Sequence, residues 1–186
     1  MSAGHRVLVL GAGPIGLAAV FWARRLGAGR IAVAASSRRR EGIAHDVGAT
    51  SFHVMDDGMG EALLRELGGE PDLVIECIGI PGMIERAIEL VRPRGTVVIL
   101  GLCLGHDSLM PFTALTKELR LQFAQGASLS QFGIVADALS SGAVEPRSMI
   151  TDTISLEALP TAFEALRQRT SQCKVMVDPW RSTRAG

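Results

Sequence analysis

The chain has 186 residues, of which 47% are hydrophobic and 20% are charged. This length and composition can bury the core of one domain, with or without an appendage, but do not suggest two equal domains. Its 19 basic residues balance 19 acidic ones, which excludes a broad surface for nucleic acid or anionic lipid. The three cysteines, Cys77, Cys103 and Cys173, are far apart in the sequence. They predict a reducing, cytoplasmic location with neither a disulfide framework nor a zinc cluster.

A run of 17 uncharged residues lies between positions 6 and 24, and it looks at first like a signal peptide or a short membrane span. Three glycines and one proline interrupt the run, which is also shorter than the roughly 20 residues of a spanning helix. A buried strand followed by a buried helix explains it better. We therefore expect no membrane partner.

Short apolar runs alternate with helical patterns along most of the chain. In chain order, the patterns predict a strand at 7–10, a helix at 14–26, a strand at 31–35, a helix at 38–48, a strand at 51–54, a helix at 61–67, a strand at 72–79, a helix at 82–91, a strand at 95–101, a strand at 118–125 and a helix at 130–142. Such alternation forms a parallel sheet covered by helices on both faces. Six strands of this kind predict the doubly wound α/β Rossmann fold.

The end of the chain has a different pattern. A strand at 150–155, a helix at 159–168 and a strand at 173–177 predict a short strand–helix–strand unit. No repeat or linker marks a second domain. We therefore expect one domain over residues 4–179, followed by a tail at 180–186.

The first predicted strand leads directly into a Gly11-x-Gly13-x-x-Gly16 motif that opens the first predicted helix. Glycine at these positions permits a tight turn, close approach of the backbone to a pyrophosphate, and close packing of helix on strand. The first helical turn, with Pro14 and Ile15, offers free N–H groups to a phosphate. Glycine-rich turns also occur for steric reasons alone, but this strand–helix context favours a dinucleotide.

The second predicted strand ends in AASSRRR (34–40), without the Asp or Glu that usually binds the adenosine ribose hydroxyls. Hydroxyl groups followed by arginines suit a phosphate monoester, which guanidinium groups bind bidentately. This pattern favours NADP(H), with NAD as the alternative, and disfavours a nucleoside methyltransferase, which uses the same acid. The residues predicted to bind the extra phosphate are Ser36, Ser37, Arg38 and Arg40.

The alternative interpretation of this segment is structural: a serine caps the next helix, and the arginines form its solvated face. Three cations at a helix N-terminus oppose the helix dipole, at a cost of about 0.3–1 kcal/mol each when exposed. A bound anion would relieve that repulsion.

Several stretches together resemble the coenzyme domain of the medium-chain, zinc-type alcohol dehydrogenases, over about residues 4–179. They are VLVLGAGPIGLAAV (7–20), RLGAGRIAV (25–33), HDVGAT (45–50), DLVIECIGIPGMIERAIELVRPRGTVVILGL (72–102), KELRLQ (117–122) and KVMVDP (174–179). The resemblance implies further cofactor contacts where the fourth, fifth and sixth strands end, and a lysine near the cofactor cleft. These residues are Cys77, Ile78, Gly79, Leu100, Gly101, Leu102, Ala124, Gln125 and Lys174. The alternative is that they are ordinary core strand ends and a solvated lysine.

Members of that family carry a catalytic domain upstream, with a Cys/His/acid zinc site that polarises the alcohol oxygen. Here the four histidines, His5, His45, His53 and His106, are scattered, and we expect them at the surface or in loops. The pair His106-Asp107 lacks a third partner for a relay, and the absence of tyrosine excludes a Tyr–Lys acid–base pair. We therefore predict no catalytic residue and no metal ligand, and expect zinc only in a missing domain.

These observations predict a fragment of a larger alcohol or polyol dehydrogenase, which moves a hydride between nicotinamide and an alcohol or ketone. We expect the isolated chain to bind its cofactor but to turn over little. The alternative is a stand-alone dinucleotide sensor with a regulatory role.

The sixth predicted strand would form one edge of the sheet. Its sequence, LRLQFAQ, has no charged residue except Arg120, so its unpaired backbone groups remain available to a partner. The resemblance implies pairing of this edge across a two-fold axis. We therefore expect a homodimer.

Overall fold

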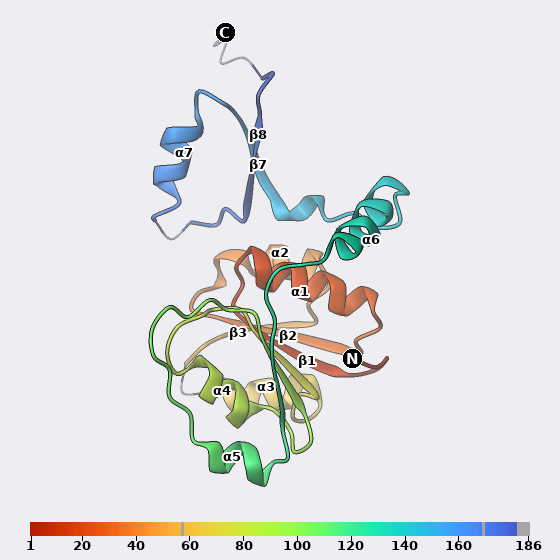
Figure 1. Ribbon diagram of the computed structural model, residues 1–186, viewed down its shortest axis with the longest axis vertical. Helices are drawn as coiled ribbons and strands as arrows, with labels where there is room; N and C mark the ends of the chain where they lie inside the picture. The colour runs from red at the N-terminus through yellow and green to blue at the C-terminus, as the bar shows by residue number, and fades with distance from the viewer. Residues whose placement is uncertain (57, 169, 182–186) are drawn as a thin grey trace.

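The computed structural model describes residues 1–56, 58–168 and 170–181. Its centre is a six-stranded parallel sheet with the strand order β3-β2-β1-β4-β5-β6 (Figure 1). The strands are β1 (Arg6–Leu10), β2 (Arg30–Ala35), β3 (Ser51–Val54), β4 (Leu73–Glu76), β5 (Thr96–Ile99) and β6 (Arg120–Phe123). This is the order of a doubly wound dinucleotide fold, so the predicted Rossmann fold is confirmed.

Helices cover both faces of the sheet. They are α1 (Pro14–Arg25) and α2 (Glu41–Asp46) on one face, and α3 (Met59–Leu67) and α4 (Met83–Leu90) on the other. Successive residues of β1 alternate between the two faces: Val7 and Val9 pack in the core under α1, while Leu8 and Leu10 pack in the core under α3 and α4. All four are fully buried, which explains why this strand has a continuous apolar sequence.

The carboxyl ends of the central strands meet where the strand order reverses, between β1 and β4. Gly11 N–H donates to Ala34 O at 2.7 Å, and Cys77 N–H donates to Leu10 O at 2.9 Å. The first bond joins the turn after β1 to the end of β2, and the second joins the turn after β4 to the end of β1. Ligands of doubly wound sheets bind in the crevice at this point.

The elements predicted at 95–101, 118–125 and 159–168 are shorter in the structure, and two others differ in a way that their local structure explains. The helix predicted at 38–48 is a 3₁₀ turn, η1 (Arg38–Arg40), followed by α2. The strand predicted at 72–79 ends at Glu76, because the Glu76 carboxylate accepts hydrogen bonds from the N–H groups two and three residues ahead and turns the chain. In addition, the loop before β6 contains a short helix that the sequence did not predict, α5 (Pro111–Thr116), with proline at its first position.

After β6 the chain forms α6 (Leu129–Ser140) and a 3₁₀ turn, η2 (Arg147–Met149). The C-terminal unit then consists of β7 (Ile150–Ser155), α7 (Leu159–Ala165) and β8 (Lys174–Asp178). The strands β7 and β8 pair in parallel as a separate sheet, beyond α1 and α2 in Figure 1, so the predicted strand–helix–strand unit is confirmed. Of the tail expected at 180–186, residues 182–186 lie outside the described residues. No helix in the described ranges is long and apolar enough to cross a membrane.

Candidate functional site

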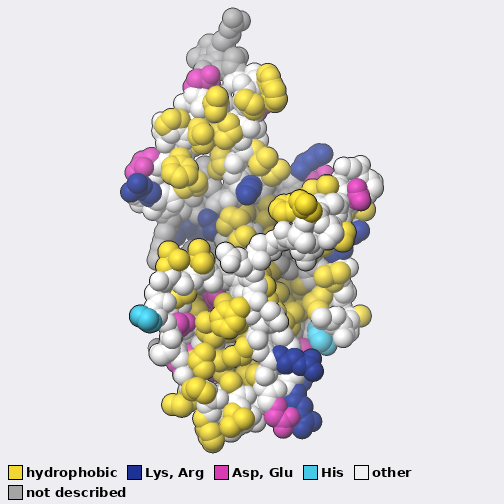
Figure 2. All heavy atoms as spheres, viewed as in Figure 1, with side chains coloured by type: hydrophobic (Ala, Val, Ile, Leu, Met, Phe, Trp, Pro, Cys, Tyr) yellow, Lys and Arg dark blue, Asp and Glu magenta, His cyan; other side chains and the backbone are white. Residues whose placement is uncertain are grey.

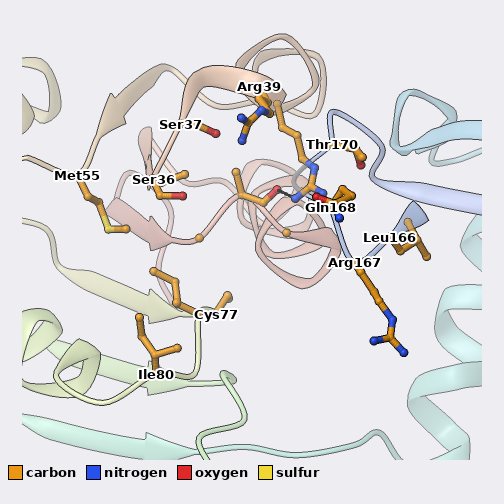
Figure 3. A pocket seen from close by; sticks show the side chains of 16 residues that line it. Ser36, Ser37, Arg39, Met55, Cys77, Ile80, Leu166, Arg167, Gln168 and Thr170 are labelled. Atoms are coloured by element: carbon orange, nitrogen blue, oxygen red, sulfur yellow. Dashed lines mark hydrogen bonds between the residues drawn. The ribbon is translucent and has the colours of Figure 1, made fainter. Parts of the chain in front are cut away.

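A cavity of about 540 Å³ lies at the carboxyl edge of the sheet (Figure 3). Its walls are the glycine turn after β1, the ends of β2 and β4, and the segment that follows α7. The predicted site residues that line it are Gly11, Gly13, Ser36, Ser37, Arg40, Cys77 and Ile78. The cavity therefore lies at three of the strand ends where the sequence predicts a cofactor site.

The three glycines of the turn have different roles in the structure. Gly11 has a φ of +104°, a conformation that favours glycine, and an added Cβ would lie 3.0 Å from Ile78 Cγ1. At Gly16 an added Cβ would collide with the carbonyl oxygen of Gly11, so this glycine allows α1 to pack against the turn. Both glycines are required by the fold itself.

Gly13 is different, because the fold does not require it. Its φ is −74°, which any residue adopts, and an added Cβ would have no heavy atom within 4 Å. The space beside Gly13 opens into the cavity. Glycine at this position leaves room for a ligand that contacts the backbone.

Gly13 is also the N-cap residue of α1, and no side chain caps this helix. The first N–H groups of a helix have no partner within the helix, and here Pro14 at the first position removes one of them. Ile15, in the same turn, is 58% exposed. The helix therefore presents unpaired N–H groups and the positive end of its dipole, which suit the pyrophosphate of a dinucleotide.

The segment after β2 contributes two hydroxyls and two guanidinium groups to the cavity. Ser36 and Ser37 line it, and Ser37 makes no capping hydrogen bond at the start of η1. Arg39 also lines the cavity and has no hydrogen-bond or ion-pair partner among the described residues. Arg38 does not line the cavity, and its Nη1 instead lies 2.5 Å from Glu41 Oε1.

Arg40 lines the cavity but is bound to backbone carbonyl groups. It donates to Ala12 O at 3.1 Å and to Gln172 O at 2.9 and 2.6 Å. Among the described residues, the lining contains three arginines, the third being Arg167, and no carboxylate. This charge balance suits a ligand with several phosphate groups.

The turn after β4 is organised by Glu76, which the sequence analysis missed. This side chain is 1% exposed, and its Oε1 accepts hydrogen bonds from Ile78 N–H at 2.6 Å and Gly79 N–H at 2.9 Å. Burial, together with the adjacent Glu76 carboxylate, raises the pKa of Cys77 to about 12. The Cys77 thiol therefore stays protonated and contributes an apolar surface to the cavity.

The other predicted cofactor contacts do not line this cavity. Gly79 and Gly101 pack closely, because an added Cβ on either would contact the backbone of the other turn. Leu100 packs against the core under α1. Four more are exposed: Leu102, Ala124, Gln125 and Lys174.

The histidines differ from expectation in one case. His53 is not at the surface: it is 6% exposed on β3, and its Nε2 lies 3.1 Å from Ser51 Oγ and 3.4 Å from Glu66 Oε2. Burial lowers its pKa, and the nearby Glu66 carboxylate only partly offsets this effect. The sequence predicted the strand that carries His53, but the polar side chains of this strand gave no sign that both of its faces are buried.

The pair His106-Asp107 is not a relay. Asp107 Oδ1 accepts hydrogen bonds from Gly82 N–H at 2.7 Å and Ser108 N–H at 2.9 Å, so it anchors the start of α4, while His106 is exposed. Within the described ranges, no three His, Cys, Asp or Glu side chains are grouped to hold a metal ion.

The C-terminal unit supplies a wall of the cavity that the sequence did not predict. This wall consists of Leu166, Arg167, Gln168 and Thr170. These residues are more than 100 positions from the glycine turn, and no local pattern marks them. Only the folded chain brings them to the cavity.

The chain is similar in sequence and fold to known proteins. The sequence profile of the family described as zinc-binding dehydrogenase matches residues 14–141. Sorbitol dehydrogenase of Ovis aries is 29% identical over 178 residues, which cover 94% of this chain and 50% of that enzyme. The chain thus spans about half the length of the curated relatives it matches.

Solved structures of similar fold contain bound dinucleotides. A zinc-binding dehydrogenase of Sinorhizobium meliloti 1021, bound to NADP, superposes with a TM-score of 0.83 at 31% identity, covering 96% of this chain and 53% of that one. An alcohol dehydrogenase of Escherichia coli CFT073, in complex with NADH, superposes with a TM-score of 0.85 at 25% identity, covering 95% of this chain and 52% of that one.

Proposed function

Because the chain belongs to the zinc-binding dehydrogenase family, we propose that it is the NADP(H)-binding domain, over residues 4–179, of an alcohol or polyol dehydrogenase. When bound, the dinucleotide supplies or accepts a hydride at its nicotinamide ring. The residues of this chain bind and orient the dinucleotide. Zinc and the proton-transfer groups of the reaction belong to another part of the enzyme.

The observation that carries the proposal is the open space at Gly13. A glycine that neither backbone conformation nor packing requires, at the uncapped start of α1, fits a diphosphate in contact with the main chain. The absence of carboxylates among the described lining residues fits the same ligand.

We further propose that Arg39, with Ser36 and Ser37, binds the 2′-phosphate of NADP(H). All three line the cavity at the end of β2, and Arg39 has a free guanidinium group in the described part of the chain. Arg38 is paired with Glu41 and Arg40 with carbonyl groups, so Arg39 is the arginine of this run most available for a phosphate.

Calorimetric titration with NADPH and NADH tests this assignment. The protein should bind NADPH more tightly than NADH, and Arg39→Met should weaken NADPH about ten-fold or more, as loss of a charge-assisted contact implies, with NADH unchanged. Arg86→Met is the matched control, because Arg86 pairs only with Glu89 on the surface of α4. A preference for NADH would overturn the assignment.

We propose that the isolated chain has little activity, because the described lining of the cavity contains no His, Asp, Glu, Lys or Tyr side chain to exchange a proton with an alcohol. Oxidation of simple alcohols at a normal enzymatic rate, with added zinc, would contradict this. The three cysteines are free thiols, as in a reducing compartment, and we propose a cytoplasmic location.

We also propose that two copies pair along β6. This strand forms one edge of the sheet, and Phe123 on it is 62% exposed. The other edge is closed, because Ser51, Phe52 and His53 of β3 are all buried. In the described part of the six-stranded sheet, the β6 edge is therefore the one open to a partner.

A further inference from the structure

Arg40 joins two parts of the chain that are far apart in sequence. Its Nη1 donates to Ala12 O, 28 residues away, and its Nε and Nη2 donate to Gln172 O, 132 residues away. Ala12 is in the glycine turn after β1, and Gln172 immediately precedes Cys173 and β8. One guanidinium group thus holds the glycine turn and the C-terminal unit together, using three of its five N–H donors.

In the described ranges, Arg40 makes the only hydrogen bonds between the C-terminal segment and the part of the chain that forms the six-stranded sheet. Among the described residues of 144–181 and 1–126, no other hydrogen bond links the two ranges. Cys173 and Met149 add apolar contacts, because they pack against the core under α1. Arg40 is therefore well placed to control how the C-terminal unit lies against the sheet.

The first consequence concerns the Ala12–Gly13 peptide. No peptide bond of the described chain is cis, and in a trans peptide the C=O and the following N–H point in opposite directions. By holding Ala12 O, Arg40 therefore fixes the direction of the Gly13 N–H. This N–H belongs to the turn where the proposed diphosphate is bound.

The second consequence concerns the far wall of the cavity. Gln168 and Thr170 line this wall and lie within four residues of Gln172. Figure 3 shows this segment facing Ser36 and Ser37 across the cavity. By holding Gln172 O, Arg40 therefore keeps the second wall in place.

We infer that Arg40 is a positioning residue for the dinucleotide site, which orients the phosphate-binding turn and holds the C-terminal segment as the second wall of the cavity. This inference rests on the proposed dinucleotide function. It assigns Arg40 a different role from Arg39. Arg39 distinguishes NADPH from NADH, whereas Arg40 supports the binding of both, because the turn contacts the part that the two share.

The test compares Arg40→Met, Arg40→Lys, Arg39→Met and the control Arg86→Met by titration with NADPH and with NADH. Arg40→Met should weaken both dinucleotides by a similar factor, about ten-fold, and leave their affinity ratio unchanged. Arg40→Lys keeps the charge but does not bridge both carbonyl groups, and it should weaken both by a smaller common factor. Arg39→Met should change the ratio.

Hydrogen–deuterium exchange on the ligand-free variants gives an independent readout. Arg40→Met should increase exchange at residues 12–13 and 166–174, while Arg39→Met and Arg86→Met should not. Loss of NADPH binding alone in Arg40→Met would show a direct 2′-phosphate contact and overturn the inference, as would unchanged affinity for both. If the wild-type chain binds neither dinucleotide, the proposed function fails. Unchanged hydrogen–deuterium exchange in Arg40→Met would separately refute the role of Arg40 in holding the glycine turn and the C-terminal unit together.

Discussion

Asp72, just before β4, accepts hydrogen bonds from two arginines at the amino edge of the sheet. Its Oδ2 lies 2.8 Å from Arg6 N and 3.2 Å from Arg6 Nε, and its Oδ1 lies 2.6 Å from Arg92 Nε. Burial alone would raise the pKa of this carboxyl, but the hydrogen bonds and charge of the arginines outweigh burial and hold it well below the ordinary value of 3.8. The ionised carboxylate therefore stabilises the folded chain.

We expect Asp72→Asn to lower the free energy of unfolding by about 2 kcal/mol at neutral pH. A depressed pKa in the folded state stabilises the protein above the pKa of the unfolded state, and this contribution disappears as the pH falls through the folded value. The difference in the free energy of unfolding between wild type and variant should therefore be largest at pH 6 and above, and should shrink below about pH 4. Urea unfolding at several pH values measures it. Glu118→Gln is the control, because its exposed pair with Arg94 should contribute little.

Cys77 illustrates how burial changes the reactivity of a side chain in the cavity. With a pKa near 12, about one Cys77 thiol in ten thousand is ionised at pH 8. Both cysteines are partly buried, but the raised pKa of Cys77 leaves little of its thiol ionised, so iodoacetamide should modify Cys103 before Cys77. Peptide mass spectrometry over a time course follows both cysteines. Modification of Cys77 as fast as Cys103 would show that the turn after β4 opens in solution.

At the scale of single elements, two glycines of the same turn have different roles: Gly16 is needed for folding and Gly13 for binding. Gly16→Ala places a methyl group against Gly11 O and should destabilise the protein by about 1–3 kcal/mol, as overpacking does elsewhere. Gly13→Ala adds the same group in open space and should leave the melting temperature unchanged while it weakens the dinucleotide about ten-fold or more. Thermal unfolding and titration on the same two variants measure both effects. A large stability loss in Gly13→Ala would contradict the assignment of that space to a ligand.

The elements that the sequence predicted well are those with local signals. β1 and α1 follow from an apolar run, a glycine turn and a proline at the first helical position, and all of these act within a few residues. The end of β4 was predicted too far along the chain, because the Glu76 side chain turns the backbone. An apolar pattern does not report such a hydrogen bond. α5 was missed because a six-residue helix is too short for a clear period.

At the scale of the whole molecule, the sequence predicted one side of the cavity but not the other. The glycine turn and the serines after β2 lie in short motifs, and the spacing of the residues in these motifs predicts dinucleotide binding. The wall after α7 and the role of Arg40 depend on how the C-terminal unit lies against the sheet. The run of three arginines suggested a common role. In the structure Arg38 pairs with Glu41 and Arg40 binds backbone carbonyl groups, whereas Arg39 has no partner among the described residues, and these differences depend on the fold.

The surface of the whole molecule bears on its assembly. Figure 2 shows hydrophobic side chains gathered around α5 and over the C-terminal unit, and Phe112, Leu115 and Phe123 are each more than 60% exposed. Monomeric proteins rarely expose many large apolar side chains together, so this surface fits an interface. The strand β6 lies beside this surface, and its unpaired backbone N–H and C=O groups can form hydrogen bonds with the same strand of a second copy.

We therefore expect Phe123→Glu to shift the protein from dimer to monomer, because two copies paired along β6 would bring two carboxylates together at their shared edge. Phe163→Glu on α7 is the control: Phe163 is similarly exposed, at 69%, but belongs to the C-terminal unit, away from the sheet edge. Light scattering after size-exclusion chromatography, over a range of concentrations, gives the mass of each variant. Two results would count against pairing along β6: a wild-type monomer at high concentration, or equal loss of the dimer in both variants. The second result would assign the association to the general apolar surface instead of the strand edge.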